Sequence, residues 1–288
     1  MLCEVSEYGT ISEQADVTLA QWEFHDLLFH ARSRSGRHSN PVGGTYRFLG
    51  QIDPLPALHP RTAEKTIKLD QPNLDNLITS DISFTQILES RISIREYGEL
   101  PITAQQLGEF LYRCARIKNQ IQTDQGELLS RPYPSGGAIY ELELYPVVDR
   151  CQDIWPGLYY YQPQAHELSC ISGETEAVEA LLKDAGMAMG QGKPQVLIVI
   201  TARFQRLAWK YESIAYALML KHVGALYQTM YLVATAMNLA PCGIGSGDSE
   251  LFAQAVGCNY YAETSVGEFV LGSRKENDAV EVDGRSTL

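Results

Sequence analysis

The stretch of residues 211–238 constrains the fold most strongly, because it is both long and strongly apolar. It still carries too many polar side chains for a membrane span, namely Glu212, Lys221, His222, Gln228 and Asn238. We therefore expect one long helix at the centre of a globular protein, with most of its surface buried. No membrane partner is expected.

The middle of the chain predicts short strands around this helix. Residues 142–148, 157–162 and 166–171 are rich in β-branched and aromatic side chains, and residues 195–201 are almost wholly apolar, as in a strand covered on both faces. Helices are expected at residues 22–29, 84–89, 103–117, 175–185 and 248–256, and a last strand at residues 266–271. Because no βαβ repeat is visible, the expected fold class is α+β.

The start of the chain lacks the regular helix and strand patterns of the rest. Residues 1–80 are irregular, with a short helical pattern followed by a proline-punctuated stretch at residues 53–60. We expect residues 1–80 to be a partly helical N-terminal extension without an assigned function, and residues 81–288 to form the main domain.

Charge and cysteine usage exclude several functional classes. The chain has 23 Lys and Arg against 35 Asp and Glu, a net charge of −12, which disfavours nucleic-acid binding. The 6 Cys are scattered without a C-x-x-C pair, which predicts reduced thiols and no zinc site. His25 and His30 lie on different faces of a helix, so we expect no metal there. Residues 1–16 lack the pattern of a signal peptide, and a cytoplasmic location is expected.

Two segments are candidates for binding an anionic ligand. Arg91, Ser93 and Arg95 alternate, so in an extended segment their side chains would point the same way and could clamp an anion. Residues 131–138, RPYPSGGA, combine stiffening prolines with glycines that let the backbone approach a ligand. A solvated edge and an ordinary turn are the respective alternatives.

Two further segments flank the apolar stretch. Residues 241–247, PCGIGSG, follow it and contain an expected loop at residues 243–247, and the amides of these glycines could face a ring nitrogen or an anion. Lys210 and Tyr211 are adjacent at the expected mouth of the buried helix, where a desolvated Lys could act as a base and Tyr could relay a proton. The alternatives are a plain turn after the helix, and a Lys whose stem packs beside Tyr while its amine reaches water.

The order of these segments resembles the FMN-binding elements of the nitroreductase superfamily. The pattern consists of Arg-x-Ser-x-Arg, Pro-Ser-Gly-Gly, Cys-Gly-Ile-Gly after a long helix, and a late Leu-Gly-Ser-Arg-Lys. Residues 131–148 and the Lys210–Tyr211 pair are similar to the SagB-type azoline dehydrogenases, a branch that oxidises thiazolines and oxazolines of ribosomally made peptides. The resemblance covers about residues 84–275, and residues 22–60 resemble the N-terminal extension of this branch.

The resemblance implies a nitroreductase-like fold, with a mostly antiparallel sheet wrapped by helices and FMN at a homodimer interface. It implies catalytic roles for Lys210 and Tyr211. It also implies a peptide substrate, presented by a cyclodehydratase partner during natural-product biosynthesis. The implied FMN contacts are Arg91, Ser93, Arg95, Arg274 and Lys275 at the phosphate and ribityl chain, Pro134, Ser135 and Gly136 from the partner subunit, and Gly245 or Ser246 at flavin N5.

The chain departs from this branch after the Lys-Tyr pair. The branch often has Tyr-Arg and then Asp-x-Gly-His, where this chain has Ala217 after Tyr216, and His222 and Ala225 at the ends of the second motif. Two other functions therefore stay open: an NAD(P)H-dependent nitro or quinone reductase, and a flavin-bearing subunit without catalytic activity.

Overall fold

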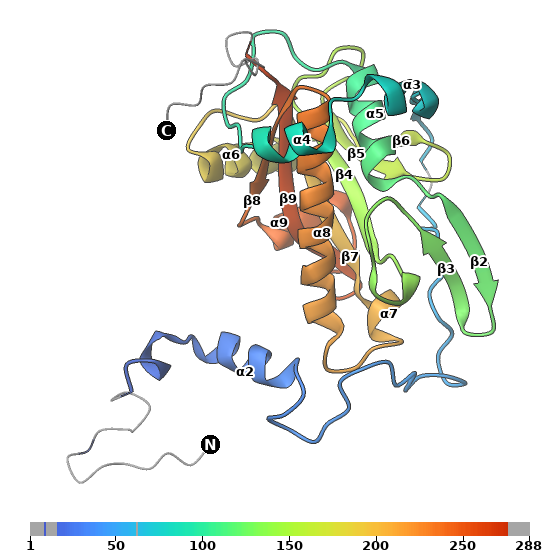
Figure 1. Ribbon diagram of the computed structural model, residues 1–288, viewed down its shortest axis with the longest axis vertical. Helices are drawn as coiled ribbons and strands as arrows, with labels where there is room; N and C mark the ends of the chain where they lie inside the picture. Colours follow the sequence, from blue (N-terminus) through green and yellow to red (C-terminus); the bar gives the residue numbers. More distant parts are fainter. Residues whose placement is uncertain (1–8, 10–15, 62, 276–288) are drawn as a thin grey trace.

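The computed structural model describes residues 9, 16–61 and 63–275. A seven-stranded sheet forms its centre (Figure 1), and each neighbouring pair of strands runs antiparallel. In sheet order the strands are β1 (Thr66–Lys68), β6 (Glu167–Ser172), β5 (Gly157–Gln162), β4 (Leu142–Val148), β7 (Val196–Arg203), β9 (Glu263–Ser273) and β8 (Leu239–Ile244). The predicted α+β class and the mostly antiparallel sheet are confirmed.

Helices cover both faces of the sheet. One face packs against α5 (Ala104–Ala115) and α8 (Ala215–Ala236), and the other against α6 (Glu176–Met189) and α9 (Ser249–Val256). In β7, Ile198 and Ile200 contribute to the first core and Leu197 and Val199 to the second. The predicted two-sided burial of this strand is confirmed, since all its residues are buried.

Local caps explain where several predicted helices begin. Thr103 accepts a hydrogen bond from the Gln106 amide, and Gln106 accepts one from the Thr103 amide, which completes a capping box at α5. The Asp248 side chain caps α9 by accepting from the Leu251 amide. Both predicted starts are confirmed to within a residue.

The start of the long apolar helix was predicted wrongly. α8 begins at Ala215, and residues 209–214 instead form a turn after α7 (Phe204–Ala208). The expected loop at residues 243–247 also starts too early, because β8 continues to Ile244. Lys210 and Tyr211 thus lie in a turn before the helix, where both side chains are only partly buried.

The remaining elements lie outside the seven-stranded sheet (Figure 1). A separate hairpin pairs β2 (Asn119–Thr123) with β3 (Gly126–Ser130), and a helical turn, η2 (Gly136–Ala138), follows it. The other elements are η1 (Leu19–Gln21), α2 (Phe24–Arg32), α3 (Leu74–Ser80) and α4 (Phe84–Ser90). The sequence did not predict β1, β2, β3 or α3.

The N-terminal part is only loosely joined to the body at α2. None of the residues of α2 is buried, and the helix stands away from the sheet in Figure 1, with Phe29 in edge contact with Tyr216 of α8. Residues 66–68, in contrast, belong to the main sheet as β1. The division at residue 80 stays a prediction, and most of residues 1–16, including Cys3, lies outside the described residues. No helix of the described chain is long and apolar enough to cross a membrane.

Candidate functional site

The Pro-Ser-Gly-Gly turn and the Lys-Tyr pair meet in space. A Cβ atom placed on Gly137 would lie 2.6 Å from the Tyr211 hydroxyl and 2.7 Å from Nζ of Lys210. Gly137 has φ of 65°, which favours glycine, and a side chain at this position would force the tips of Tyr211 and Lys210 to move. The two polar tips of Lys210 and Tyr211 therefore converge on the backbone of this turn.

Residues 42–46 hold the Lys-Tyr segment in place from the other side. The Tyr46 amide donates to the Lys210 carbonyl (3.2 Å), and the Glu212 amide donates to the Gly43 carbonyl (3.1 Å). The Lys210 ammonium lies over the rings of Tyr46 and Tyr211, 5.4 and 5.5 Å from their centroids. A cation over two aromatic faces is held by electrostatic attraction.

Arg206 and Trp209 bind the N-terminal segment beside the pair. The Arg206 guanidinium donates to the carbonyls of Leu55 (2.7 Å), Glu127 (2.7 Å) and Ile139 (2.8 Å), and the Trp209 indole donates to a further carbonyl of the segment. Burial, with the neighbouring Arg203 charge, lowers the pKa of Arg206 to about 10. These contacts enclose a cavity of about 120 Å³ that Lys210 helps to line.

His222 contacts the Pro-Ser-Gly-Gly turn from α8. Its Nε2 accepts a hydrogen bond from the Gly136 amide at 2.7 Å, and its Nδ1 lies 2.7 Å from Oε1 of Glu141. Glu141 is fully buried and precedes β4. His222 stands where the branch often has Asp, and its contact with the turn was not predicted.

The arginines expected at a phosphate lie towards the other end of α8. The Arg91 guanidinium lies 5.2 Å from the centroid of the Tyr231 ring, and the Ser93 hydroxyl is 2.8 Å from the Tyr231 hydroxyl. The Ile94 amide donates to the carbonyl of Pro241, which ties this extended segment to β8. Arg95 and Ser93 are exposed, whereas Arg91 is partly buried.

Arg274 and Lys275 follow β9 near the same end. A guanidinium nitrogen of Arg274 lies 3.4 Å from Oδ1 of Asn238, which comes just after α8. Lys275 is paired with Glu96. Nε of Arg274 is buried and has no hydrogen-bond partner among the described residues. Arg274 and Lys275 border a cavity of about 570 Å³.

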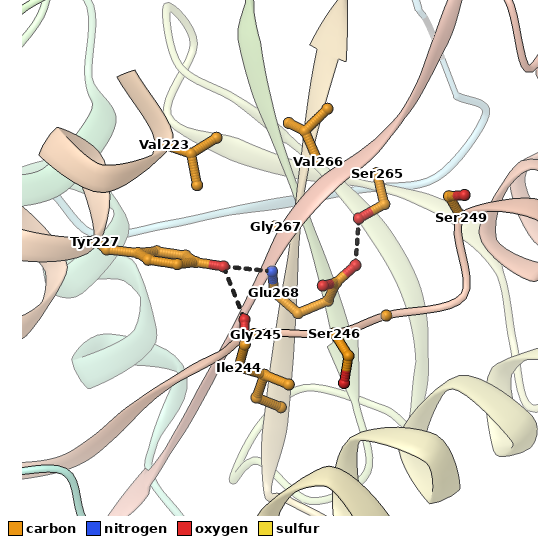
Figure 2. A pocket seen from close by; sticks show the side chains of 11 residues that line it. Val223, Tyr227, Ile244, Gly245, Ser246, Ser249, Ser265, Val266, Gly267 and Glu268 are labelled. Carbon is orange, nitrogen blue, oxygen red and sulfur yellow. Dashed lines mark hydrogen bonds between the residues drawn. The ribbon is translucent and has the colours of Figure 1, made fainter. Parts of the chain in front are cut away.

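The glycine loop after β8 borders a third cavity, of about 390 Å³ (Figure 2). Gly245 and Ser246 line it together with Tyr227 and Glu268, and the Tyr227 hydroxyl joins the Ile244 carbonyl to the Glu268 amide. Burial raises the pKa of Glu268, and the hydrogen bond from Ser265 opposes this shift. The sequence analysis missed Glu268 because it lies on a strand and not in the loop.

The close approach of this loop to Glu268 requires a glycine. A Cβ atom placed on Gly247 would lie 2.1 Å from the carboxyl carbon of Glu268. Gly245, in contrast, has no atom within 4 Å of that position, so its side faces the cavity. Space for a ligand therefore exists over Gly245 and Ser246.

These groups form two halves that lie apart within one chain. Tyr231, which contacts Arg91 and Ser93, lies sixteen residues after the first residue of α8, about 24 Å along the helix axis. Lys210 and Tyr211 precede that first residue. In the described residues, no group of three or more His, Cys, Asp or Glu is placed to hold a metal ion.

The model of the nitroreductase family matches residues 88–272, and the chain therefore belongs to this family. Membership makes the chain an oxidoreductase by class, and the resemblance stated from the sequence is confirmed. A second model, described as cyanobactin oxidase ThcOx, matches residues 2–39.

Two individual relatives each match this chain over most of their own length. A putative nitroreductase of Methanocaldococcus jannaschii is 27% identical over 184 residues, 63% of this chain and 85% of that protein. The microcin B17-processing protein McbC of Escherichia coli is 25% identical over 210 residues, 67% of this chain and 75% of that protein.

Among solved structures, the fold is similar to a chain in the E. coli microcin synthetase McbBCD complex with truncated pro-MccB17 bound. The TM-score is 0.53 at 16% identity, over 87% of this chain and 92% of that chain.

Proposed function

We propose that this chain is an FMN-dependent azoline dehydrogenase, which oxidises thiazoline or oxazoline rings of a ribosomally made peptide to thiazoles or oxazoles. The observation that carries the proposal is the convergence of Lys210 and Tyr211 on the Gly137 turn. Similarity to a protein that processes microcin B17 supports the peptide substrate. A cyclodehydratase that makes the rings and presents the peptide is the expected partner.

The residues present fit FMN. Nε of Arg274 is a buried donor with no hydrogen-bond partner in the part of the chain that the structure describes, as expected of a group that meets an anion. Arg91, Ser93 and Arg95 would hold the phosphate and ribityl chain with Arg274 and Lys275, and the open side of Gly245 and Ser246 would accept the ring. When bound, FMN supplies the acceptor for the two electrons that the azoline loses as a hydride.

The protein's own part in the reaction is to remove a proton. Aromatisation requires that the α-carbon of the azoline lose a proton while its neighbouring carbon loses a hydride. Lys210 or Tyr211 takes this proton, because their polar tips lie together at the turn. Backbone hydrogen bonds to residues 43 and 46 hold the segment that carries the pair, so its tips stay in place at the turn.

The FMN site is proposed to form between two copies of the chain. FMN joins its phosphate to its ring by a single ribityl chain, whereas Lys210 lies beyond the start of α8 and Arg91 about 24 Å along the helix. Pro134, Ser135 and Gly136 would come from the partner copy together with Lys210. Tyr216 and Leu220 of α8 are 46% and 40% exposed, an apolar face that a second copy would cover.

A pair of substitutions tests the catalytic assignment. Lys210→Ala and Tyr211→Phe should keep the flavin absorbance but lower azoline oxidation by about 10²-fold, the scale of general base catalysis. Reduction of a nitroaromatic by NADH should hardly change, because it needs no such base. Lys221→Ala removes an exposed Lys of α8 and serves as the matched control.

The reductase remains a second candidate because a relative is a putative nitroreductase. Wild-type oxidation rates in both variants would leave the Lys-Tyr pair structural and favour this reductase. A purified protein that holds flavin but catalyses neither reaction, with or without partners, would instead favour the non-catalytic subunit.

Mixed dimers test the shared site. Arg91→Ala/Arg274→Ala and Lys210→Ala variants should each be inactive alone. When co-expressed in equal amounts they should recover about a quarter of wild-type oxidation, since half the dimers are mixed and carry one intact site. If both halves came from the same copy, no activity would return.

A further inference from the structure

The turn that meets Lys210 and Tyr211 has an unfavourable backbone. Gly137, Ala138 and Tyr140 have φ of 65°, 58° and 50°, in the left-handed region that side-chain-bearing residues avoid. Such conformations persist where surrounding contacts over-determine them. The contacts that hold this turn therefore decide where its backbone sits relative to the Lys-Tyr pair.

Some of these contacts come from the turn itself. The Ala138 amide donates to the Ser135 carbonyl (3.2 Å), and the Tyr140 amide donates to the Ser135 hydroxyl (3.0 Å). These bonds fix the shape of the turn but not its position in the protein. Its position against α8 is set by the hydrogen bond from the Gly136 amide to His222.

The hydrogen bonds define one protonation state of His222. A backbone amide can only donate, so Nε2 of His222 must be the bare nitrogen and Nδ1 must carry the proton. Nδ1–H then donates to the Glu141 carboxylate, which has no exposed surface. Glu141 thus selects the tautomer in which Nε2 can accept from Gly136.

Side chains lie close to the turn on both sides, His222 near Gly136 and the Lys-Tyr pair near Gly137. A Cβ atom on Gly136 would lie 3.2 Å from Nε2 of His222, and one on Gly137 would meet the tips of Lys210 and Tyr211. We propose that His222, oriented by Glu141, is a positioning residue that holds the Gly136–Gly137 turn against Lys210 and Tyr211. The activity part of this proposal rests on the proposed function, whereas the structural part does not.

The tautomer can be observed directly. In protein labelled with ¹⁵N-histidine, NMR at neutral pH should show His222 with a protonated Nδ1 and a bare Nε2, identified by the loss of its signals in His222→Gln. A proton on Nε2, or on both nitrogens, would overturn the proposal.

Variants separate positioning from stability. His222→Leu alone leaves Glu141 buried without its partner and could fail to fold. The double variant Glu141→Leu/His222→Leu replaces both groups by apolar ones, which should keep the melting temperature near wild type. In this variant the peptide segment that contains Gly136 should exchange its amide hydrogens about tenfold faster, because its donor has lost its acceptor.

His222→Gln is the conservative variant, since its amide oxygen can replace Nε2 as the acceptor. It should bring exchange of the Gly136 segment back towards the wild-type rate. The control is His59→Leu, because His59 and Glu263 form a second pair at the same distance, 2.7 Å, away from the turn, and Glu263 keeps the hydroxyls of Tyr145 and Thr201 as donors. This control should leave exchange of the Gly136 segment unchanged.

The activity readout is the split between kcat and KM. The double Leu variant should lower kcat for azoline oxidation, measured per bound flavin, by about tenfold or more with KM little changed, because misplaced catalytic groups affect the chemical step. Wild-type exchange and wild-type kcat in a folded double variant would refute the positioning role. If the wild-type protein oxidised no azoline, the proposed function would fail, and the exchange and NMR results would still decide the role of His222.

Discussion

Gly137→Ala tests whether the turn must fit closely against the Lys-Tyr pair. The new methyl group would lie 2.6 Å from the Tyr211 hydroxyl and 2.7 Å from Lys210 Nζ, whereas ordinary contacts begin at 3.4 Å. The tips of these side chains must therefore retreat by about 0.8 and 0.7 Å, and misplacement of about 1 Å can cost about 10²-fold in rate. The φ of 65° adds about 1–2 kcal/mol of strain for alanine.

Gly190→Ala is the matched control for strain. Gly190 ends α6 with φ of 68°, and a Cβ atom there meets nothing within 4 Å. Urea unfolding should show a similar loss of about 1–2 kcal/mol in both variants. Azoline oxidation per bound flavin should fall by about 10²-fold in Gly137→Ala only. The reasoning would be refuted if both glycine variants oxidised the substrate equally fast.

Three further variants have defined outcomes. Arg91→Ala/Arg274→Ala should weaken FMN binding by about 3–6 kcal/mol, because two charge-assisted contacts are lost. The flavin should then be lost on gel filtration. Full flavin occupancy would place the phosphate elsewhere. Arg206→Leu leaves three backbone carbonyls without a donor and should lower the free energy of unfolding by about 3 kcal/mol or more, and a smaller loss would show that water replaces the guanidinium. Because burial raises the pKa of Glu268, the stability that this group contributes is lost as pH rises. Glu268→Gln should therefore raise Tm at about pH 8, and the gain should shrink towards about pH 5. A gain in Tm that does not depend on pH would contradict this.

The sequence predicts the ends of helices and strands where neighbouring residues determine them. The strand at residues 142–148 matches β4 residue for residue, because its apolar and β-branched side chains need cover on both faces. The starts of α5 and α9 follow from the caps at Thr103 and Asp248, which act within three residues. In these places the side chains that define the boundary are neighbours in the sequence.

Boundaries set by distant contacts could not be predicted in this way. The apolar pattern continues through Tyr211, but the chain turns there because residues 210–214 bond to residues 42–46. Pro241 and Gly243 suggested a loop, yet β8 is an end strand of the sheet, where a proline is tolerated. Pairing with β9, not local preference, decides this strand.

The same distinction holds for the candidate site. Lys210, Tyr211 and the glycine turn were chosen from their residue types, but the sequence did not predict that they meet in space. His222 could not be connected to the turn, because its partners Gly136 and Glu141 are 86 and 81 positions away. Whether Arg91, Ser93, Arg95 and Arg274 bind a phosphate stays a prediction.

The long sequence separation between Arg203 and its N-terminal partner has a consequence for synthesis. Arg203 donates to the Ala57 carbonyl across 146 residues, so the N-terminal segment leaves the ribosome long before its partner is made. At about 5–20 residues per second, this segment must wait about 7–30 s without its binding site. The Lys210 cavity is complete only after residue 210 has been made, and a chain terminated before Arg206 would carry the glycine turn without this cavity.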